Sequence, residues 1–156
     1  MNYLTSISIE VLKKLSIAEK TLSTAESCTG GLIASTITDV PGASKVFVGG
    51  VVVYATEMKH KLLGISDKVF NYGVISAEMA EAMSVAVRSL TGSDYSIATT
   101  GNLGPDTMEG KPRGLIYIAV ATPEKVYVKE LHLQGDRLSN KIEATFEALK
   151  LLIEVL

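Results

Sequence analysis

Nucleophilic side chains gather in a short segment near the start of the chain. Residues 27–31 contain a serine, a cysteine, a threonine and two glycines, and they follow residues 21–25, which read as a short β-strand. We expect a helix to begin near Thr29. The first turn of a helix carries N–H groups without intrahelical partners and a partial positive charge, so it can hold a phosphate or a developing oxyanion. The same residues also fit a structural turn with a serine or threonine as N-cap.

Lys59 is a candidate base for this nucleophile. It falls in a short helix expected at 57–63, directly after a β-branched run at 45–54 that reads as a strand. A lysine that is partly removed from water has a lowered pKa, and its neutral amine can then take a proton from a serine. The alternative is an ordinary solvated lysine on a helix surface, and the local sequence leaves both open.

Two further segments suit the binding of a ligand. Arg137 follows Gly135 and Asp136 at the start of the last expected helix, where its guanidinium can bind a phosphate or pair with a carboxylate. Residues 101–114 form the one long loop, with four glycines and two prolines. Such a loop offers backbone amides that a ligand can approach closely, although any long turn has the same composition.

Nucleotide-binding and metal-binding signatures are missing from the sequence. It contains neither a Gly-x-x-x-x-Gly-Lys-Ser/Thr run nor a Gly-x-Gly-x-x-Gly run that follows a strand. His60 and His132 are isolated from other residues at metal-ligand spacing. We therefore expect no metal and no cofactor, and we do not expect a Ser-His-acid triad.

Composition narrows the class of protein. The 156 residues suit one domain spanning 1–156, with 47% hydrophobic and 21% charged residues. A net charge of −2 with scattered lysines and arginines argues against nucleic-acid binding, and no apolar run is long enough to span a membrane. Cys28 is the only cysteine, and the first residues do not resemble a signal peptide. We expect a cytoplasmic protein.

Periodicity predicts an α/β fold. Helices are expected at about 7–20, 29–38, 57–63, 76–91 and 138–156, and strands at 21–25, 45–54, 95–99, 115–122 and 125–133. Ser76 is the best helix cap, and Met79 and Met83 fall on the core face of the helix behind it. This order favours a mixed sheet with helices on both faces.

The sequence resembles the CinA C-terminal domain family over nearly its whole length, from about Leu15 to the end. The motifs that carry the resemblance are Ala25-Glu26-Ser27-Cys28-Thr29-Gly30-Gly31, Thr38-Asp39-Val40-Pro41-Gly42-Ala43-Ser44, Gly50-Val51-Val52-Val53-Tyr54, Lys59, Leu63-Gly64, Gly73-Val74-Ile75-Ser76, Gly104-Pro105-Asp106, Lys111-Pro112 and Gly135-Asp136-Arg137. Members are nicotinamide mononucleotide deamidases. The resemblance implies a three-layer α/β/α sandwich and hydrolysis of the nicotinamide carboxamide to nicotinate mononucleotide and ammonia, in NAD salvage.

The resemblance also implies roles for individual residues. Ser27 matches the family nucleophile, Lys59 the general base, and Tyr54 a tyrosine that contacts the substrate or the serine–lysine pair. The oxyanion would be stabilised by backbone N–H groups either around 29–31 or in the loop after Gly101. The residues expected to bind the substrate, a small nucleotide, are Thr29, Gly30, Gly31, Tyr54, Gly101, Asn102, Gly104 and Arg137. Family habit and apolar strands also lead us to expect a homo-oligomer.

Two positions depart from the family pattern. Asn102-Leu103 stands where Ile-Ala is usual, and Lys141 stands where a second arginine is common. An exposed Asn102 can bind a ribose or an amide, or it can be a tolerated turn residue. A catalytically silent nucleotide-binding module is therefore an alternative, and a competence- or damage-associated accessory protein is another. Many relatives carry an additional N-terminal domain that resembles molybdopterin-binding proteins, and we expect this chain to lack it.

Overall fold

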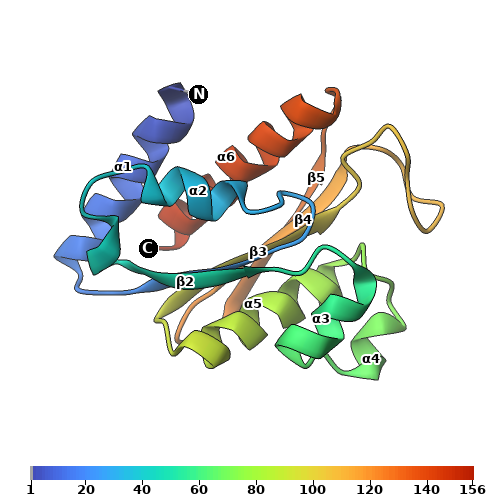
Figure 1. Ribbon diagram of the computed structural model, residues 1–156, viewed down its shortest axis with the longest axis horizontal. Helices are drawn as coiled ribbons and strands as arrows, with labels where there is room; N and C mark the ends of the chain where they lie inside the picture. The colour runs from blue at the N-terminus through green and yellow to red at the C-terminus, as the bar shows by residue number, and fades with distance from the viewer. Residues whose placement is uncertain (1) are drawn as a thin grey trace.

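A computed structural model describes residues 2–156 of the protein. The centre of the fold is one mixed β-sheet (Figure 1). Its five strands lie in the order β2-β1-β3-β4-β5. Strand β1 pairs in parallel with β2 and with β3, whereas β4 is antiparallel to both β3 and β5. The strand bounds are β1 Leu22–Glu26, β2 Phe47–Val52, β3 Tyr95–Gly101, β4 Leu115–Ala121 and β5 Val126–His132.

Helices cover both faces of this sheet, as expected for a three-layer α/β/α sandwich (Figure 1). Helices α1, α2 and α6 lie on one face, and α3, α4 and α5 lie on the other. A short 3-10 helix at Ala43–Lys45 precedes β2. The helix bounds are α1 Asn2–Ile17, α2 Leu32–Thr38, α3 Thr56–Leu63, α4 Asp67–Phe70, α5 Ala77–Thr91 and α6 Arg137–Val155.

Each helical layer packs on the sheet through its own apolar cluster. The α1–α2–α6 side buries Ile33 and Leu149 against Ile118, and the α5 side buries Met79 and Met83. The methionines are core residues, as their helical spacing predicts, and Ser76 caps α5 by accepting a hydrogen bond from the N–H of Met79 at 3.1 Å. Burial of one such side chain contributes about 1.5–3 kcal/mol, so these clusters hold the sheet between two fixed layers.

One edge of the sheet collects most of the segments that the sequence singles out. Strands β1, β2 and β3 are parallel, and β5 runs with β3 because both are antiparallel to β4. Their carboxyl ends therefore lie at the same edge, and the chain leaves them as the segments 27–31, 53–56, 102–114 and 133–136. Crevices at the carboxyl ends of strands are the usual ligand sites of open α/β sheets.

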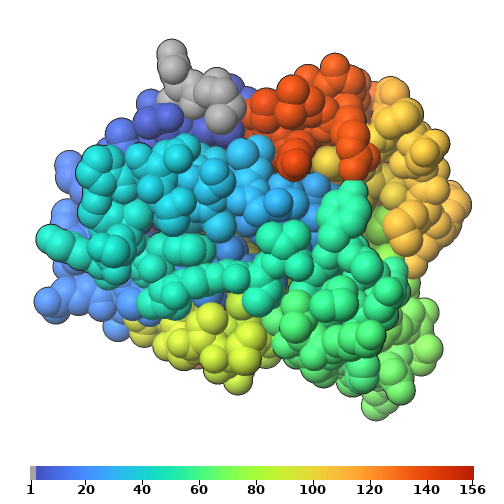
Figure 2. Space-filling model, in the orientation of Figure 1, coloured from blue at the N-terminus to red at the C-terminus, as the bar shows by residue number. Residues whose placement is uncertain are grey.

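Helices α1 and α2 begin at residues that differ from those predicted from the sequence. Helix α1 already begins at Asn2 and ends at Ile17, before the left-handed Glu19 (φ 56°). Helix α2 begins at Leu32 and not near Thr29, because Gly30 and Gly31 adopt left-handed φ values of 61° and 102°. Residues 27–31 therefore form an elbow between β1 and α2 and are not a first helical turn. Figure 2 shows β2 and the segment after it on the front surface of the molecule.

Candidate active site

Ser27 and Lys59 meet directly after the carboxyl ends of β1 and β2. The Nζ atom of Lys59 lies 2.9 Å from Oγ of Ser27, and both residues are buried, with only 2% of Lys59 exposed. The backbone of Ser27 is fixed because its N–H donates to the carbonyl of Thr99 on β3 at 3.1 Å. Lys59 lies in the first half of α3, and its side chain reaches the residues that follow β1 and β2.

Two backbone carbonyls orient the amine of Lys59. Its Nζ donates to the carbonyl of Val53 at 2.8 Å and to that of Tyr54 at 3.4 Å. Burial lowers the pKa of Lys59 from 10.5 to about 8, against opposing effects of Cys28 and Glu109. A neutral amine has two N–H donors, and those two carbonyls can take both. Its lone pair then faces the hydroxyl of Ser27, which is the arrangement that a general base needs.

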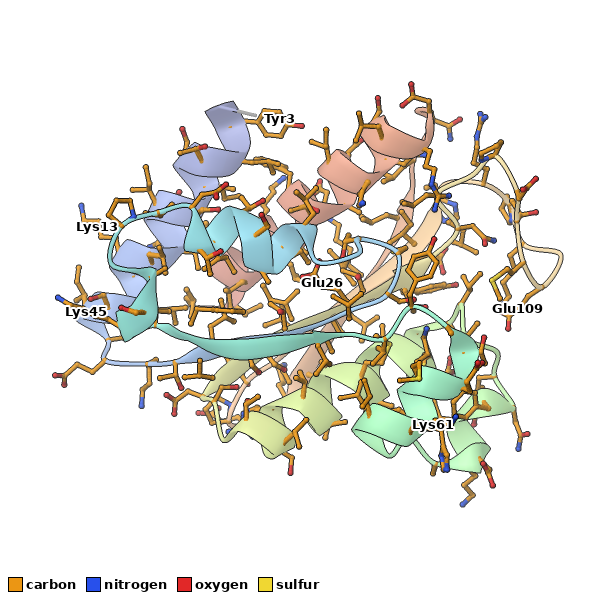
Figure 3. All side chains as sticks on the ribbon, viewed as in Figure 1. Tyr3, Lys13, Glu26, Lys45, Lys61 and Glu109 are labelled. Atoms are coloured by element: carbon orange, nitrogen blue, oxygen red, sulfur yellow. The ribbon has the colours of Figure 1, made fainter. Side chains whose placement is uncertain are left out.

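The elbow after Ser27 is held by Glu26, which Figure 3 labels beside the start of α2. Its buried carboxylate accepts hydrogen bonds from the Thr29 hydroxyl and from the N–H groups of Gly31, Ile33 and Ala34. A carboxylate at this position also complements the positive end of the helix. The N–H groups of α2 are thus already bound, and the sequence analysis did not identify Glu26 as their partner.

This capping changes the expected role of residues 29–31. The Thr29 hydroxyl is buried between Glu26 (2.6 Å) and Thr99 (2.8 Å), and the N–H of Gly30 donates to the carbonyl of Ser27. None of the three residues lines the pocket described below. The expectation that their N–H groups bind an oxyanion or a phosphate is therefore not supported by the geometry for Gly30 and Gly31. An acidic residue before a Ser/Thr-Gly-Gly turn is the sequence signal that points to such a cap.

Cys28 lies next to Ser27 but is a poor nucleophile. The thiol is buried, and burial raises its pKa to about 12. A thiol with such a pKa remains protonated at neutral pH, whereas the thiolate is the reactive form. The structure thus favours Ser27 over Cys28 at this elbow.

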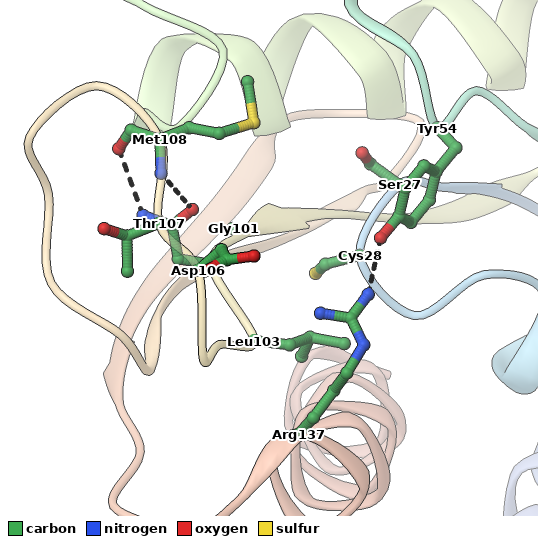
Figure 4. Close-up of a pocket in the computed structure, with 10 residues that line it drawn as sticks. Ser27, Cys28, Tyr54, Gly101, Leu103, Asp106, Thr107, Met108 and Arg137 are labelled. Atoms are coloured by element: carbon green, nitrogen blue, oxygen red, sulfur yellow. Dashed lines mark hydrogen bonds between the residues drawn. The ribbon is translucent and has the colours of Figure 1, made fainter.

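A cavity of about 230 Å³ opens above Ser27 (Figure 4). It brings together Ser27 and Cys28 from the elbow, Tyr54 from the end of β2 and Arg137 from the start of α6. The remaining wall comes from the long loop, namely Gly101, Asn102, Leu103, Asp106, Thr107 and Met108. Asp106, Thr107 and Met108 are pocket residues that the sequence analysis missed, because composition alone does not tell which part of a loop faces a site.

Asn102 supports the pocket wall from within the loop. Only 4% of the residue is exposed, which contradicts the expectation of an exposed side chain. Its Nδ2 donates to the carbonyls of Met108 (3.2 Å) and Lys111 (3.1 Å), and its Oδ1 accepts from the N–H of Met108 (3.0 Å). The amide of Asn102 is thus used to fold the loop, although the residue borders the pocket.

Arg137 and Tyr54 close one side of the pocket mouth. The guanidinium donates to the Tyr54 hydroxyl at 2.7 Å (Figure 4) and to the carbonyl of Gly104, also at 2.7 Å. Asp136 is not its partner, since this carboxylate caps α6 by accepting from the N–H of Ser139 at 2.9 Å. Gly104 therefore contributes its carbonyl to the site, and Arg137 remains a cation at the entrance.

Lys141 lies one helical turn after Arg137, on the side of α6 that faces the elbow. A Cβ atom placed on Gly30 would be 3.4 Å from the Nζ of Lys141, so this ammonium packs over the turn that follows Ser27. No ion pair of Lys141 occurs among residues 2–156. Arg137 lines the pocket, whereas Lys141 adds a second cationic side chain over the adjacent elbow.

Other chemistries find less support in the part of the chain that the structure describes. Within residues 2–156, no three His, Cys, Asp or Glu side chains form a group that could hold a metal ion. Within the same residues, no helix is both long and apolar enough to cross a membrane. His60 bonds through Nδ1 with the carbonyl of Ile65 at 2.9 Å, at the far end of α3. The arrangement of the pocket suits attack by a serine on a carbonyl carbon.

Comparisons with known proteins agree with the resemblance seen in the sequence. A family model described as the CinA C-terminal domain matches residues 4–156. A relative from Caldanaerobacter subterraneus, which carries the provisional name competence-damage inducible protein, is 52% identical over 129 residues, covering 81% of this chain and 31% of the relative. A CinA-like protein from Frankia casuarinae is 44% identical over 137 residues, covering 87% of this chain and 32% of the relative.

A solved structure has the same fold. The crystal structure of a CinA superfamily protein from Escherichia coli matches with a TM-score of 0.95 and 29% identity, over 98% of this chain and 90% of that chain. The chain spans about a third of the length of the curated relatives that it matches.

Proposed function

The chain belongs to the CinA C-terminal domain family, and from this membership and the site geometry we propose that it hydrolyses the carboxamide of nicotinamide mononucleotide. The products would be nicotinate mononucleotide and ammonia, and we propose that the reaction serves NAD salvage and takes place in the cytoplasm. The observation that carries the proposal is the 2.9 Å contact between the buried Lys59 amine and the Ser27 hydroxyl, beside a pocket with a cationic entrance.

The first half of the proposed reaction forms an acyl-enzyme. Neutral Lys59 takes the Ser27 proton while Oγ bonds to the carboxamide carbon, and the carbonyl electron pair moves onto oxygen. Collapse of this tetrahedral oxyanion breaks the carbon–nitrogen bond, and the lysine ammonium returns its proton to the departing nitrogen. Ammonia leaves, and the nicotinoyl group remains on Ser27 as an ester.

Water completes the proposed cycle. Lysine, again neutral, takes a proton from a water molecule whose oxygen bonds to the ester carbon. Collapse of the second tetrahedral species breaks the bond to Oγ, and the lysine ammonium reprotonates Ser27. The acid product loses its proton to solvent. Each of the two attack steps needs a proton acceptor that is uncharged at neutral to mildly alkaline pH. Lys59, with a pKa of about 8, meets this need.

The oxyanion would be stabilised by main-chain N–H groups near Ser27 that have no acceptor in the protein. The first N–H groups of α2 are in part not available to an oxyanion, because those of Gly31, Ile33 and Ala34 donate to Glu26. Within residues 2–156, the N–H groups of Cys28 and Leu103 donate to no backbone carbonyl, and both residues line the pocket. One N–H group from the elbow and one from the loop would together form the oxyanion hole.

The cationic entrance supports recognition of the 5′-phosphate. Arg137 offers a planar guanidinium at the mouth, with Tyr54 beside it, and Lys141 adds a second positive charge one turn further along α6. Arginine forks suit phosphate oxygens, and such charge-assisted bonds are about twice as strong as neutral ones. Nicotinamide itself lacks this group, so the mononucleotide is the better fit.

An ammonia-release assay tests the proposal. Purified protein is incubated with nicotinamide mononucleotide in the presence of EDTA, with Ser27→Ala as the matched control. We expect ammonia from the native protein and background release from Ser27→Ala. A protein that binds the nucleotide but releases no ammonia would be a silent binding module, and a strict metal requirement would contradict the mechanism.

We also propose that the protein is a homo-oligomer that uses the free edge of β2. Val48 is 51% exposed and Val52 is 48% exposed, and the strand carries no charged residue. Uncharged edge strands favour pairing with another chain. Light scattering of the native protein and of Val48→Lys should show an oligomer that the lysine dissociates. A monomeric native protein would contradict this proposal.

A further inference from the structure

Glu109 joins the pocket loop to the segment that precedes α5. Its Oε2 accepts from the N–H of Val74 at 2.8 Å, and its Oε1 accepts from the N–H of Ile75 at 3.0 Å. Lys111 donates to the same carboxylate at 3.2 Å and to the carbonyl of Ile75. We call this set of contacts the Glu109 clasp. Figure 3 shows Glu109 on the loop, well away from Glu26.

The backbone around the clasp is shaped to make these contacts. Glu109 itself has a left-handed φ of 61°, a conformation that side chains other than glycine rarely adopt. Gly73 has a φ of 91°, and a Cβ atom at that position would lie 2.8 Å from the Glu109 carboxylate. Strained non-glycine residues persist only where their surroundings fix them, and they cluster at functional sites.

The far side of the clasp is a fixed point in the fold. The Thr100 hydroxyl on β3 donates to the carbonyl of Val74 at 2.6 Å, and Ser76 begins α5 immediately after Ile75. On the near side, Thr107 and Met108 directly precede Glu109 and line the pocket. The clasp thus links the outer wall of the pocket to the rigid sheet and to α5.

The remaining contacts of the loop hold other parts of it. Asn140 donates to the carbonyl of Leu103 at 3.0 Å, and Arg137 donates to that of Gly104, so α6 fixes the first residues of the loop. Asn102 joins the two arms of the loop to each other. Glu109, together with the contact of Lys111 with the Ile75 carbonyl, therefore ties the outer end of the loop to the body of the protein.

We propose that Glu109 is a positioning residue whose clasp holds Asp106, Thr107 and Met108 in place as the substrate-facing wall of the pocket. The kinetic part of this inference rests on the proposed deamidase function. Loss of the clasp leaves the contact between Ser27 and Lys59 in place, because both residues lie on other segments, while loss of the Glu109 charge further lowers the pKa of Lys59. Its expected effect is weaker substrate binding, with a smaller change in turnover.

The charge of the carboxylate is consistent with this role. Burial raises the pKa of Glu109, but the N–H groups of Val74 and Ile75 and the ammonium of Lys111 outweigh that effect and lower it. The group is thus ionised at neutral pH, and charge-assisted hydrogen bonds of this kind are among the stronger ones in proteins.

Glu109→Gly tests the inference against a matched control, Glu19→Gly. Glycine accepts a left-handed φ without strain, so the variant removes the carboxylate contacts of the clasp, leaves the contact of Lys111 with the Ile75 carbonyl, and relieves the backbone. Glu19 is the other non-glycine residue with a left-handed φ among residues 2–156, and it is exposed near the amino end of β1, at the edge opposite the pocket. Both variants change glutamate to glycine, but only one touches the loop.

Amide exchange and kinetics are both measured in the full chain. In Glu109→Gly we expect at least about tenfold faster exchange of the Val74, Ile75, Thr107 and Met108 amides, and at least about a tenfold higher KM for nicotinamide mononucleotide with kcat changed less than about threefold. Glu19→Gly should match the native protein in both. Glu109→Gln, which keeps one acceptor, should fall between the two and covers the case in which Glu109→Gly does not fold.

The other outcomes separate the existence of the clasp from its role in the pocket. Unchanged exchange in Glu109→Gly would overturn the clasp, and faster exchange with an unchanged KM would overturn its role in the pocket. A fall in kcat alone would place Glu109 in the chemistry and would also overturn the inference. If the native protein does not hydrolyse the mononucleotide, the proposed function fails, and the exchange of the wall amides alone decides whether the clasp positions the wall.

Discussion

Lys59 and Ser27 are 32 positions apart in the chain, yet the Lys59 amine lies 2.9 Å from the Ser27 hydroxyl in the interior of the protein. Two carbonyls from residues 53 and 54 hold the amine, and the β1–α2 elbow holds the hydroxyl. The pair is thus set before any substrate arrives, as expected for a nucleophile and its base.

Removal of either member of the pair should abolish turnover. We expect Ser27→Ala and Lys59→Met each to reduce kcat by roughly three orders of magnitude or more, since the two groups act as one unit. Circular dichroism should show folded proteins. Cys28→Ala serves as the neighbouring control and should retain most activity. Activity that survives in Ser27→Ala and disappears in Cys28→Ala would identify the thiol as the nucleophile.

The activity should rise with pH up to about 8. Lys59 accepts a proton only as the neutral amine, and its pKa is about 8, so below this value kcat/KM falls by about tenfold per pH unit. Cys28 does not titrate in this range, because burial raises its pKa to about 12. A pH–rate profile of the native protein checks this. A limb centred near 6.5, the usual value for histidine, would point to another base.

Stability should also depend on the protonation of Lys59. Its pKa is about 8 in the folded protein and near the ordinary 10.5 in the unfolded chain, so between these values the unfolded chain binds more protons and stability rises with pH. Lys59→Met lacks this rise. Urea unfolding at pH 8 and pH 10 should therefore show the native protein gaining stability relative to Lys59→Met. A constant difference between the two proteins would contradict the lowered pKa.

Arg137→Ala should weaken binding of the phosphate. We expect its KM to increase about tenfold or more for nicotinamide mononucleotide, equal to about 1.4 kcal/mol, and far less for nicotinamide riboside, which has no phosphate. Lys150→Ala, an exposed cation further along α6, is the control. Steady-state kinetics on both substrates give the answer. Equal damage to both would mean that Arg137 only supports the loop through Gly104.

Asn102→Ala should loosen the pocket loop. The substitution leaves the N–H of Met108 and the carbonyl of Lys111 without their partner, which costs about 1–3 kcal/mol for each group that stays buried, whereas the carbonyl of Met108 keeps the N–H of Lys111. Asn71→Ala, at an exposed position after α4, is the control. Thermal unfolding and KM should both change in Asn102→Ala only. If KM changes without any loss of stability, the amide of Asn102 contacts the substrate instead.

Local patterns in the sequence determined the elements of this fold. The spacing of Met79 and Met83 and the cap at Ser76 act within a few residues, so α5 is predicted with its correct start and its buried face. The β-branched runs likewise predict each strand of the sheet. The predicted starts of α1 and α2 were wrong, that of α2 because Gly30 and Gly31 adopt left-handed φ values and Glu26, several residues earlier, binds the N–H groups of the helix start.

Tertiary structure decided how the residues named from the sequence come together, and it added Asp106, Thr107 and Met108 to the pocket. The order β2-β1-β3-β4-β5 brings the carboxyl ends of β1, β2, β3 and β5 to one edge, and no local pattern encodes that order. The burial of Lys59, which lowers its pKa, depends on the sheet beneath α3, and a helix periodicity cannot show it. The inward turn of Asn102 depends on partners six and nine positions away. Short-range patterns in the sequence determine local backbone geometry. The exclusion of water from side chains and the contact between distant segments arise only when the helical layers pack on the sheet.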